Sequence, residues 1–98
     1  MDKDVYVVDV SWEQLMKDGK ILRSSAIAGV FEDLDDAIES ALANSDDKAS
    51  VEEIRDEILK TGMSEVFLNN FRLEDGTEAY RPLAIISEDV LIEKNKDE

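Results

Sequence analysis

An apolar stripe at helical spacing in the middle of the chain is the feature that most limits its fold. Five apolar residues recur at positions i, i+3, i+4, i+7 and i+8, namely Leu34, Ala37, Ile38, Ala41 and Leu42. This spacing predicts an amphipathic helix over residues 34–44. A helix with one apolar side must pack against another element, so the chain needs a sheet or a second helix beneath it.

Capping residues mark the start of this helix and both ends of a second one. Asp33 stands where an N-cap belongs. Ser50 and Glu53 have the spacing of a capping box, and Gly62 suits a helix C-terminus that turns left-handed. A second helix is therefore predicted over residues 51–61. Its expected apolar positions are Val51, Ile54, Ile58 and Leu59.

Two strands are predicted before the helices. Residues 5–12 alternate with a period of two and are rich in β-branched and aromatic residues, which is typical of a strand. Residues 21–31 form a second extended segment, expected to pair with the first as a hairpin. Ser24-Ser25 and Gly29 in this segment are candidate positions for a β-bulge.

Two further strands are predicted after the helices, over residues 66–74 and 77–86. The Asp75-Gly76 pair between them is a signal for a tight hairpin. Pro82 lacks a backbone N–H, so it is expected at a sheet edge or at the start of a strand.

Two stretches near these strands allow more than one structure. Residues 64–70 fit either an extension of the strand or a helical turn, and the strand is favoured. Residues 87–89 lie between two short apolar runs, which form either one bent strand or a tight hairpin.

The expected fold is a small single α+β domain with element order ββααββ, and a fifth strand is left open as an alternative. Strands grouped at both ends of the chain favour an antiparallel sheet with the two helices packed on one face. The 98 residues suit one domain. Its ordered core is expected over about residues 4–93, with a frayed tail at 94–98.

The charge of the chain limits its partners. The sequence holds 25 acidic and 11 basic residues, which gives a net charge of −14. Such a chain repels phosphate backbones and anionic membranes, so neither direct nucleic-acid binding nor membrane binding is expected. The expected partner is another protein, and a basic surface would be attracted most strongly. The lack of cysteine fits a reducing compartment, and a cytoplasmic location is predicted.

The residue types exclude most catalytic chemistry. Without His or Cys, the chain cannot form a Ser-His-Asp triad, a Cys-His dyad or a His-ligated metal site. It also lacks the glycine-rich motifs that cradle phosphates. A non-enzymatic protein without cofactor or metal is therefore predicted. This prediction rests on the residue types that the chain lacks and not on a motif that it contains.

Two uses of the carboxylates remain as alternatives. The first is an enzyme that uses only carboxylates, Lys, Ser or Tyr, for which Asp9 is the most interesting acid because it lies among apolar residues of the first strand. A partly exposed strand face explains Asp9 equally simply. The second is a calcium site, but the acids near Asp33 lack the central Gly and terminal Glu of a calcium loop. The Asp75-Gly76 pair is better explained as a turn.

The acids are concentrated in the helical region. Residues 32–57 hold eleven acids against Lys48 and Arg55, a net charge of −9. This surface is a solvated face, a docking surface for a protein, or a mimic of a nucleic-acid backbone that occupies a basic site on a DNA- or RNA-binding protein. The candidate partner-binding residues are Asp35, Asp36, Glu39, Asp46, Asp47, Glu52, Glu53, Asp56 and Glu57.

Three aromatic residues are expected in the core rather than at a binding surface. Trp12 continues the apolar side of the first strand, and Phe67 and Phe71 fit the apolar side of a later one.

Overall fold

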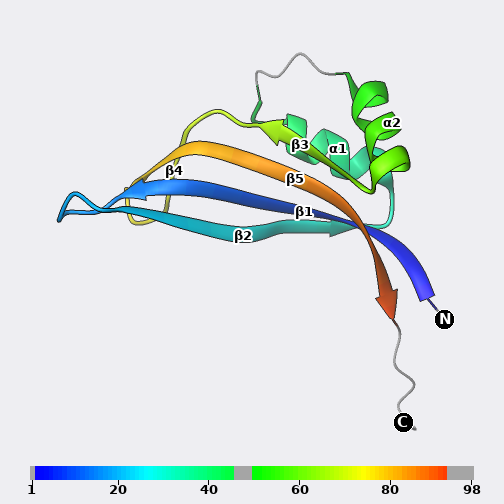
Figure 1. Cartoon of the computed structure of the whole chain (residues 1–98), viewed down its shortest axis with the longest axis horizontal. Coiled ribbons are helices and arrows are strands. Elements are labelled where there is room, and N and C mark those ends of the chain that lie inside the picture. Colours follow the sequence, from blue (N-terminus) through cyan, green and yellow to red (C-terminus); the bar gives the residue numbers. More distant parts are fainter. Residues whose placement is uncertain (1, 46–49, 93–98) are drawn as a thin grey trace, which may run out of the picture.

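The fold is an antiparallel sheet of five strands with two helices (Figure 1), as a computed structural model that describes residues 2–45 and 50–92 shows. The predicted α+β class is confirmed, and the order ββααββ is extended by a fifth strand. The elements are β1 (Asp2–Leu15), β2 (Ile21–Phe31), α1 (Leu34–Leu42), α2 (Val51–Thr61), β3 (Met63–Phe67), β4 (Phe71–Arg72) and β5 (Glu78–Ile92). The tail predicted at 94–98 lies outside the described residues.

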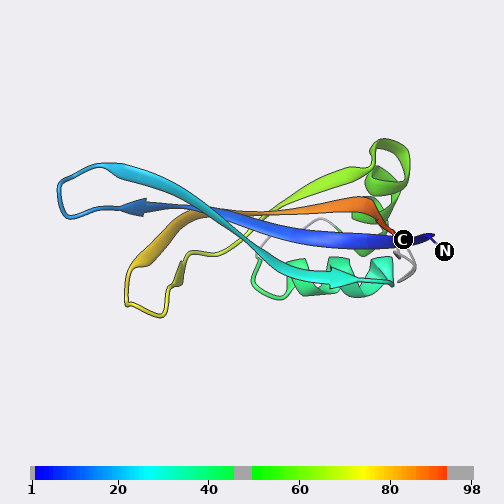
Figure 2. The ribbon, with the colours of Figure 1, turned by 90° about the horizontal axis from the view of Figure 1, so that it is seen from below.

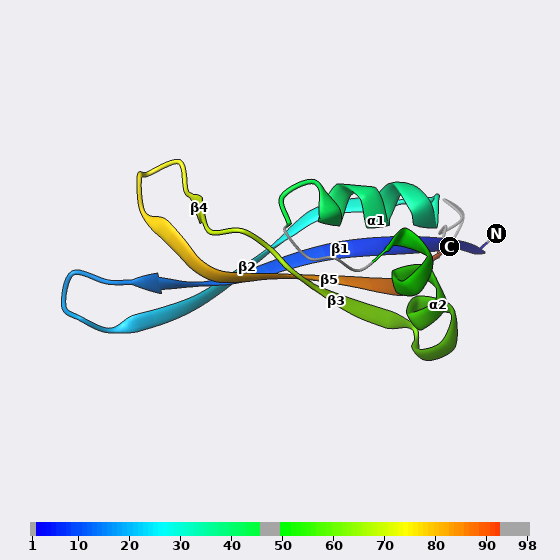
Figure 3. The same cartoon turned by 90° about the horizontal axis from the view of Figure 1, so that it is seen from above.

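The sheet has the strand order β2-β1-β5-β3, and the short β4 pairs with β5 beside this path. Both helices lie on the same side of the sheet, near the end where β1 begins and β5 finishes (Figures 1 and 3). The β1–β2 hairpin and the β4–β5 turn reach beyond the helices at the opposite end (Figure 2). The helices therefore cover one part of one face.

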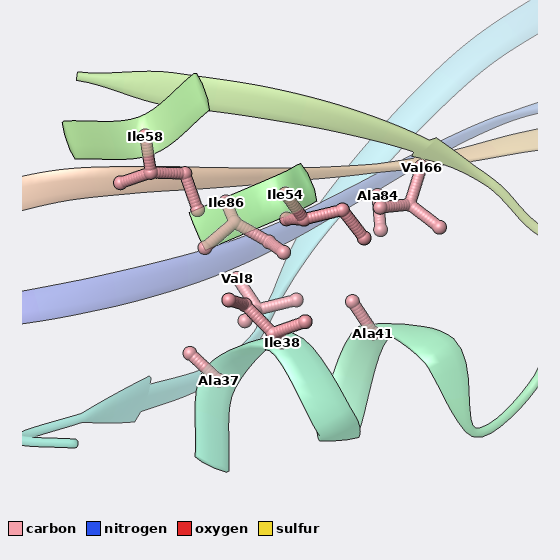
Figure 4. Packing of buried hydrophobic residues seen from close by; sticks show 9 residues of the cluster. All are labelled: Val8, Ala37, Ile38, Ala41, Ile54, Ile58, Val66, Ala84 and Ile86. Carbon is pink, nitrogen blue, oxygen red and sulfur yellow. The ribbon is translucent and has the colours of Figure 1, made fainter. Parts of the chain in front are cut away.

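The core lies between the helices and the sheet (Figure 4). Strand β1 contributes Val8, and the central strand β5 contributes Ala84 and Ile86. Alternate residues of a strand point to the same face, which is why these side chains meet the helices. The other buried members of the cluster are Ala37, Ile38 and Ala41 of α1, Ile54 and Ile58 of α2, and Val66 of β3.

The predicted helix caps are confirmed. The Asp33 carboxylate accepts hydrogen bonds from the backbone N–H groups of Asp35 and Asp36, at 2.8 and 3.4 Å. The Ser50 hydroxyl accepts from the N–H of Glu53 at 3.1 Å. Gly62 has a φ of 87° and ends α2 in the left-handed conformation, which a side chain would make costly.

The predicted strand over 66–74 is wrong, because the structure divides it into two. Strand β3 ends at Phe67, which leaves residues 64–67 in a strand and 68–70 outside it. The backbone N–H of Asn69 donates to the carbonyl of Asn44 at 2.9 Å, beyond α1. This contact turns the chain away from the sheet before β4 begins.

The predicted hairpin at Asp75-Gly76 is confirmed. Phe71 of β4 pairs with Ala79 of β5, and Gly76 has a φ of 87°. The Asp75 carboxylate accepts a hydrogen bond from the Thr77 N–H at 2.9 Å, and this bond lowers the pKa of Asp75. Asp75 therefore serves the turn, as the sequence indicated.

Strand β5 is continuous through residues 87–89, which settles the alternative left open by the sequence. The expected edge position of Pro82 is wrong, because β5 lies between β1 and β3 in the centre of the sheet. The β1–β5 register shifts between the pairs Ser11–Leu83 and Glu13–Tyr80, next to Arg81 with a φ of 49°. This irregularity lets a central strand contain a residue without an N–H.

A second irregularity lies in the β1–β2 pair. Gly29 pairs with Val8 and Ile27 pairs with Asp9, so Ala28 is an extra residue on β2. The bulge predicted near Gly29 is thus confirmed. Strand β1 also runs beyond the predicted 5–12, since Gln14 pairs with Leu22 and accepts a hydrogen bond from the Ser24 hydroxyl at 2.9 Å.

Leu59 and Trp12 do not lie where the sequence placed them. Leu59 was expected on the packed side of α2, but its side chain is 63% exposed. Trp12 was expected in the core but is half-buried outside the main cluster. Its ring meets the edge of Phe71 at a centroid distance of 5.8 Å, so these two aromatics cover the sheet where the helices do not reach.

Candidate functional site

The predicted acidic residues form an exposed surface on the two helices, which we call the acidic helix surface. It consists of Asp35, Asp36 and Glu39 of α1 with Glu52, Glu53, Asp56 and Glu57 of α2, all exposed. The packing of both helices on one face of the sheet brings these seven residues into one layer (Figure 3). Asp46 and Asp47, also candidates, lie outside the described residues.

One ion pair joins the two helices within this surface. The Arg55 guanidinium donates to the Asp35 carboxylate through Nε at 2.9 Å and Nη2 at 2.7 Å. The hydrogen bond to Asp35 raises the pKa of Arg55, and the charges of Asp35, Glu52 and Asp56 raise it further. Asp35 is therefore partly used in holding α1 to α2, unlike the other acids of its helix.

The position of an acid along its helix explains why some of the acids occur where they do. Asp35 and Asp36 lie in the first turn of α1, and Glu52 and Glu53 lie in the first turn of α2. The positive end of the helix dipole stabilises carboxylates there. The remaining three acids, Glu39, Asp56 and Glu57, have no such explanation. They lie beyond the first turn, where the dipole has little effect.

The sheet face opposite the helices carries a second surface, which the sequence analysis missed. Cross-strand partners share a face, and three rows run across β2, β1, β5 and β3 on the side away from the core. The rows are Val30–Val7–Ser87–Met63, Ile27–Asp9–Ile85–Glu65 and Ser25–Ser11–Leu83–Phe67. We call these twelve residues the open face. In the part of the chain that the structure describes, no element covers it.

Large apolar side chains are exposed on the open face. Phe67 is 69% exposed, Ile27 67% and Val30 57%. The expectation that Phe67 is a core residue is therefore wrong: alternation in β3 turns Val66 to the helices and Phe67 to the opposite side. Near the middle of the face, Val7 and Ile85 are half-buried only by their neighbours in the sheet.

A signal for this surface was present in the sequence. The run Leu83-Ala84-Ile85-Ile86 is apolar at every position, which is typical of a strand covered on both faces. Residues 2–45 and 50–92 contain two helices, and both lie on the side of Ala84 and Ile86. The side of Leu83 and Ile85 is left without a cover.

Asp9 lies in the middle row of the open face, opposite Ile27 and Ile85. It is half-buried, so the simple interpretation of a partly exposed strand face is consistent with its environment. Glu65, at the β3 end of the same row, is exposed. These two acids are the only charged residues among the twelve.

A groove of about 470 Å³ lies on the helix side of the sheet, beside the C-terminal end of α1. Residues of α1, β1, β2 and β5 line it together with Leu68 and Phe71. Its polar lining residues are Ser40 and Asn44, and none of its lining residues titrates. The groove can therefore hold an apolar group but offers no acid or base to react with it.

No protein-family model, curated protein or solved structure matches this chain.

The residues that the structure describes also bear on membrane-spanning segments and metal sites. No helix among them has the length and apolar character needed to cross a membrane. They also contain no group of three or more carboxylates arranged to hold a metal ion.

Tyr6 has an acidic environment beside the core. Burial raises the pKa of its phenol, and the negative charges of Glu88, Asp4 and Asp33 raise it further. We expect Tyr6 to deprotonate above the usual value of about 10. Because the folded-state pKa is raised, the resulting stabilisation is present below the unfolded-state pKa and is lost as the pH rises through the folded-state pKa.

Absorbance titration of a Tyr80→Phe variant measures this directly, because Tyr6 is then the only tyrosine. A midpoint at or below the value of an unfolded tyrosine would show that burial and the neighbouring carboxylates do not together raise the pKa of the phenol.

Proposed function

We propose that this protein is a non-enzymatic binding module that docks on another protein through the open face. The observation that carries the proposal is the exposure of large apolar side chains, Phe67, Ile27 and Val30, on a sheet face that no described element covers. A contiguous apolar surface on a folded domain is typical of an interaction site. A rigid sheet also presents its side chains in fixed positions, which limits the entropy lost on binding.

The charges indicate the chemistry of the partner. Asp9 and Glu65 lie among the apolar residues of the open face, which holds no basic residue. The chain as a whole has a net charge of −14. A partner with an apolar patch surrounded by Lys and Arg would match both features, and its approach would be accelerated by electrostatic attraction. We propose a cytoplasmic location for this interaction, in keeping with a cysteine-free chain.

The concave parts of the molecule support a binding role over catalysis. The groove beside α1 has no titratable lining residue. A second hollow includes Glu13, Tyr80 and Arg81, but Glu13 is only half-buried and the other two are exposed. A catalytic carboxylate usually needs stronger desolvation than this. The carboxylate-only enzyme therefore has the weaker support.

Phe67→Ser tests the docking proposal, with Leu59→Ser as the matched control. Both residues are large, apolar and more than 60% exposed, but Leu59 lies on α2 on the other side of the sheet. A partner is first isolated from host lysate with the parent protein, and its affinity is then measured for each variant. Truncating a large aromatic residue that an interface buries lowers affinity by about thirtyfold or more when that residue is a hot spot.

We expect that loss for Phe67→Ser and parent-like affinity for Leu59→Ser. Because both side chains are exposed, both variants should keep the circular dichroism spectrum of the parent. Equal affinities of parent and Phe67→Ser would exclude the open face as the docking surface. If the parent retains no protein specifically, the proposal that this protein is a protein-binding module is contradicted.

A second candidate function is mimicry of a nucleic-acid backbone by the acidic helix surface. The observation that favours it is the exposure of seven carboxylates in one layer, three of which neither helix caps nor first-turn positions explain. Carboxylates three or four positions apart on a helix lie roughly 5–6 Å apart at their Cβ atoms, close to the scale of phosphate spacing. A partner bound in this way should be displaced by nucleic acid.

A further inference from the structure

Strand β2 is an unprotected edge of the sheet. Among the residues that the structure describes, it pairs with β1 alone, and its eleven residues leave a row of backbone N–H and C=O groups facing outward. Proteins usually protect such edges with short strands, prolines or charges. The opposite edge strand, β3, has five residues and carries Glu65. Strand β2 contains no proline and one charge, Arg23.

A bulge protects only part of β2. The extra residue Ala28 interrupts the regular pairing, and residues 21–27 before it form a regular stretch of seven. This stretch is longer than the average strand of about 5–6 residues. It also lies largely beyond the end of α1, so the helices do not obstruct its outer edge (Figures 2 and 3).

Exposed apolar side chains follow the same edge on both faces of the sheet. Ile21 and Ile27 are 69% and 67% exposed, and Leu22 and Val30 are also exposed. A strand added beside β2 would cover these side chains laterally while it pairs with the free backbone groups. A single added strand would therefore pair with the free backbone groups and cover the exposed apolar side chains.

The distribution of charge along β2 identifies the added strand. Residues 20–31 contain Lys20 and Arg23 and no acid, in a chain with a net charge of −14. A second copy therefore meets less repulsion here than at the acidic helix surface. The basic residues lie at the start of the strand, and the acids Glu32 and Asp33 follow its end. With the pairing centred on Ser24, Arg23 of each copy lies opposite Ser25 of the other and Lys20 lies opposite Ala28, so the basic residues meet uncharged positions and no two acids face each other along the paired stretch.

We propose that a second copy of this chain binds at β2, with the two β2 strands antiparallel about a two-fold axis. This axis is perpendicular to the sheet, because antiparallel pairing of identical edges keeps corresponding faces on the same side. The two sheets become one. The helices of both copies lie on one side of it, and the two open faces join on the other. This dimer does not depend on the proposed docking function.

Ile27→Lys tests the dimer, with Leu59→Lys as the matched control. The two residues have similar exposure and the substitutions add the same charge, but only Ile27 lies on the proposed interface. Sedimentation equilibrium of the full chain should give twice its mass of 11.0 kDa for the parent and for Leu59→Lys. Ile27→Lys should raise the dimer dissociation constant by at least about tenfold.

Single cysteines test the orientation, since the chain has none of its own. A cysteine at Ser24, the centre of the regular stretch, should form a disulfide with its copy. A cysteine at Ile21 should not, because antiparallel pairing about the centre of residues 21–27 separates the two copies of Ile21 by about 20 Å.

Three results would overturn the proposal: a monomeric parent, a dimer that Ile27→Lys does not weaken, or disulfide formation as fast at Ile21 as at Ser24. A monomeric parent that still loses its partner on Phe67→Ser would exclude the dimer and leave the docking function intact.

Discussion

Replacing Ile58 by alanine should lower the free energy of unfolding by about 2–5 kcal/mol. The Ile58 side chain is fully buried and joins α2 to the cluster that contains Ile38 and Ile86 (Figure 4). The cost combines the lost burial of the removed carbons with the cavity that remains. Because small domains have a total stability of about 5–15 kcal/mol, the variant should lose a large fraction of it.

The adjacent residue provides the control. Leu59 follows Ile58 in α2 but is 63% exposed, so Leu59→Ala should change the free energy of unfolding by no more than about 0.5 kcal/mol. Denaturant unfolding followed by circular dichroism measures both variants. An equal loss for the two substitutions would mean that Leu59 is packed, as its apolar character had suggested, and that α2 is rotated from the orientation described above.

The sequence predicted best those elements whose ends carry local signals. Helix α2 was predicted at its observed bounds, because Ser50 caps its first turn and Gly62 provides the left-handed turn at its end. Strand β2 was also predicted at its observed bounds, since turn residues precede it and the Asp33 cap follows it. In each case the interactions that end the element lie within a few residues of its boundary.

The elements that were predicted poorly are determined by contacts between distant residues. The chain leaves β3 after Phe67 because the N–H of Asn69 binds the carbonyl of Asn44. In β5, Ser87 and Glu88 look like a break in the sequence, yet they pair with Val7 and Tyr6 of β1. Neither local propensity nor periodicity contains this information, which depends on how the whole sheet is assembled.

The candidate site was predictable in the same uneven way. The side of each helix that carries acids follows directly from the apolar stripe on the opposite side. The open face follows from the predicted packing of both helices on one face of the sheet, but no single strand reveals which of its alternating residues face the helices. Phe67 and Val66 are neighbours in β3, and only this placement decides which is buried and which is exposed.

Neutralising the acidic helix surface should have the largest effect on binding if the protein mimics a nucleic-acid backbone. The variant combines Asp36→Asn, Glu39→Gln, Glu53→Gln and Glu57→Gln, and it keeps Asp35 because that carboxylate binds Arg55. We expect the affinity for a captured nucleic-acid-binding protein to fall on the order of 10²-fold, because several charge pairs with the partner are lost together.

Stability should change little in this variant. Removing the like-charge pairs Asp36–Glu39 and Glu53–Glu57 is favourable by about 0.2–0.5 kcal/mol each. Asp36 and Glu53 also lie in the first turns of their helices, where the dipole stabilises their charges by about 0.3–1 kcal/mol. These contributions oppose one another, so a loss of binding would come from the surface and not from unfolding.

A matched control separates the position of the charges from their number. Asp4→Asn, Asp18→Asn, Glu74→Gln and Glu88→Gln remove the same total charge from exposed residues outside both helices. This control should bind the partner nearly as well as the parent. Binding to the parent should weaken steeply as salt is added, because ions at 0.1 M screen exposed charges beyond about 10 Å. If the partner holds the helix variant as tightly as the parent, the acidic helix surface is only a solvated face, and docking through the open face is the interpretation that stands.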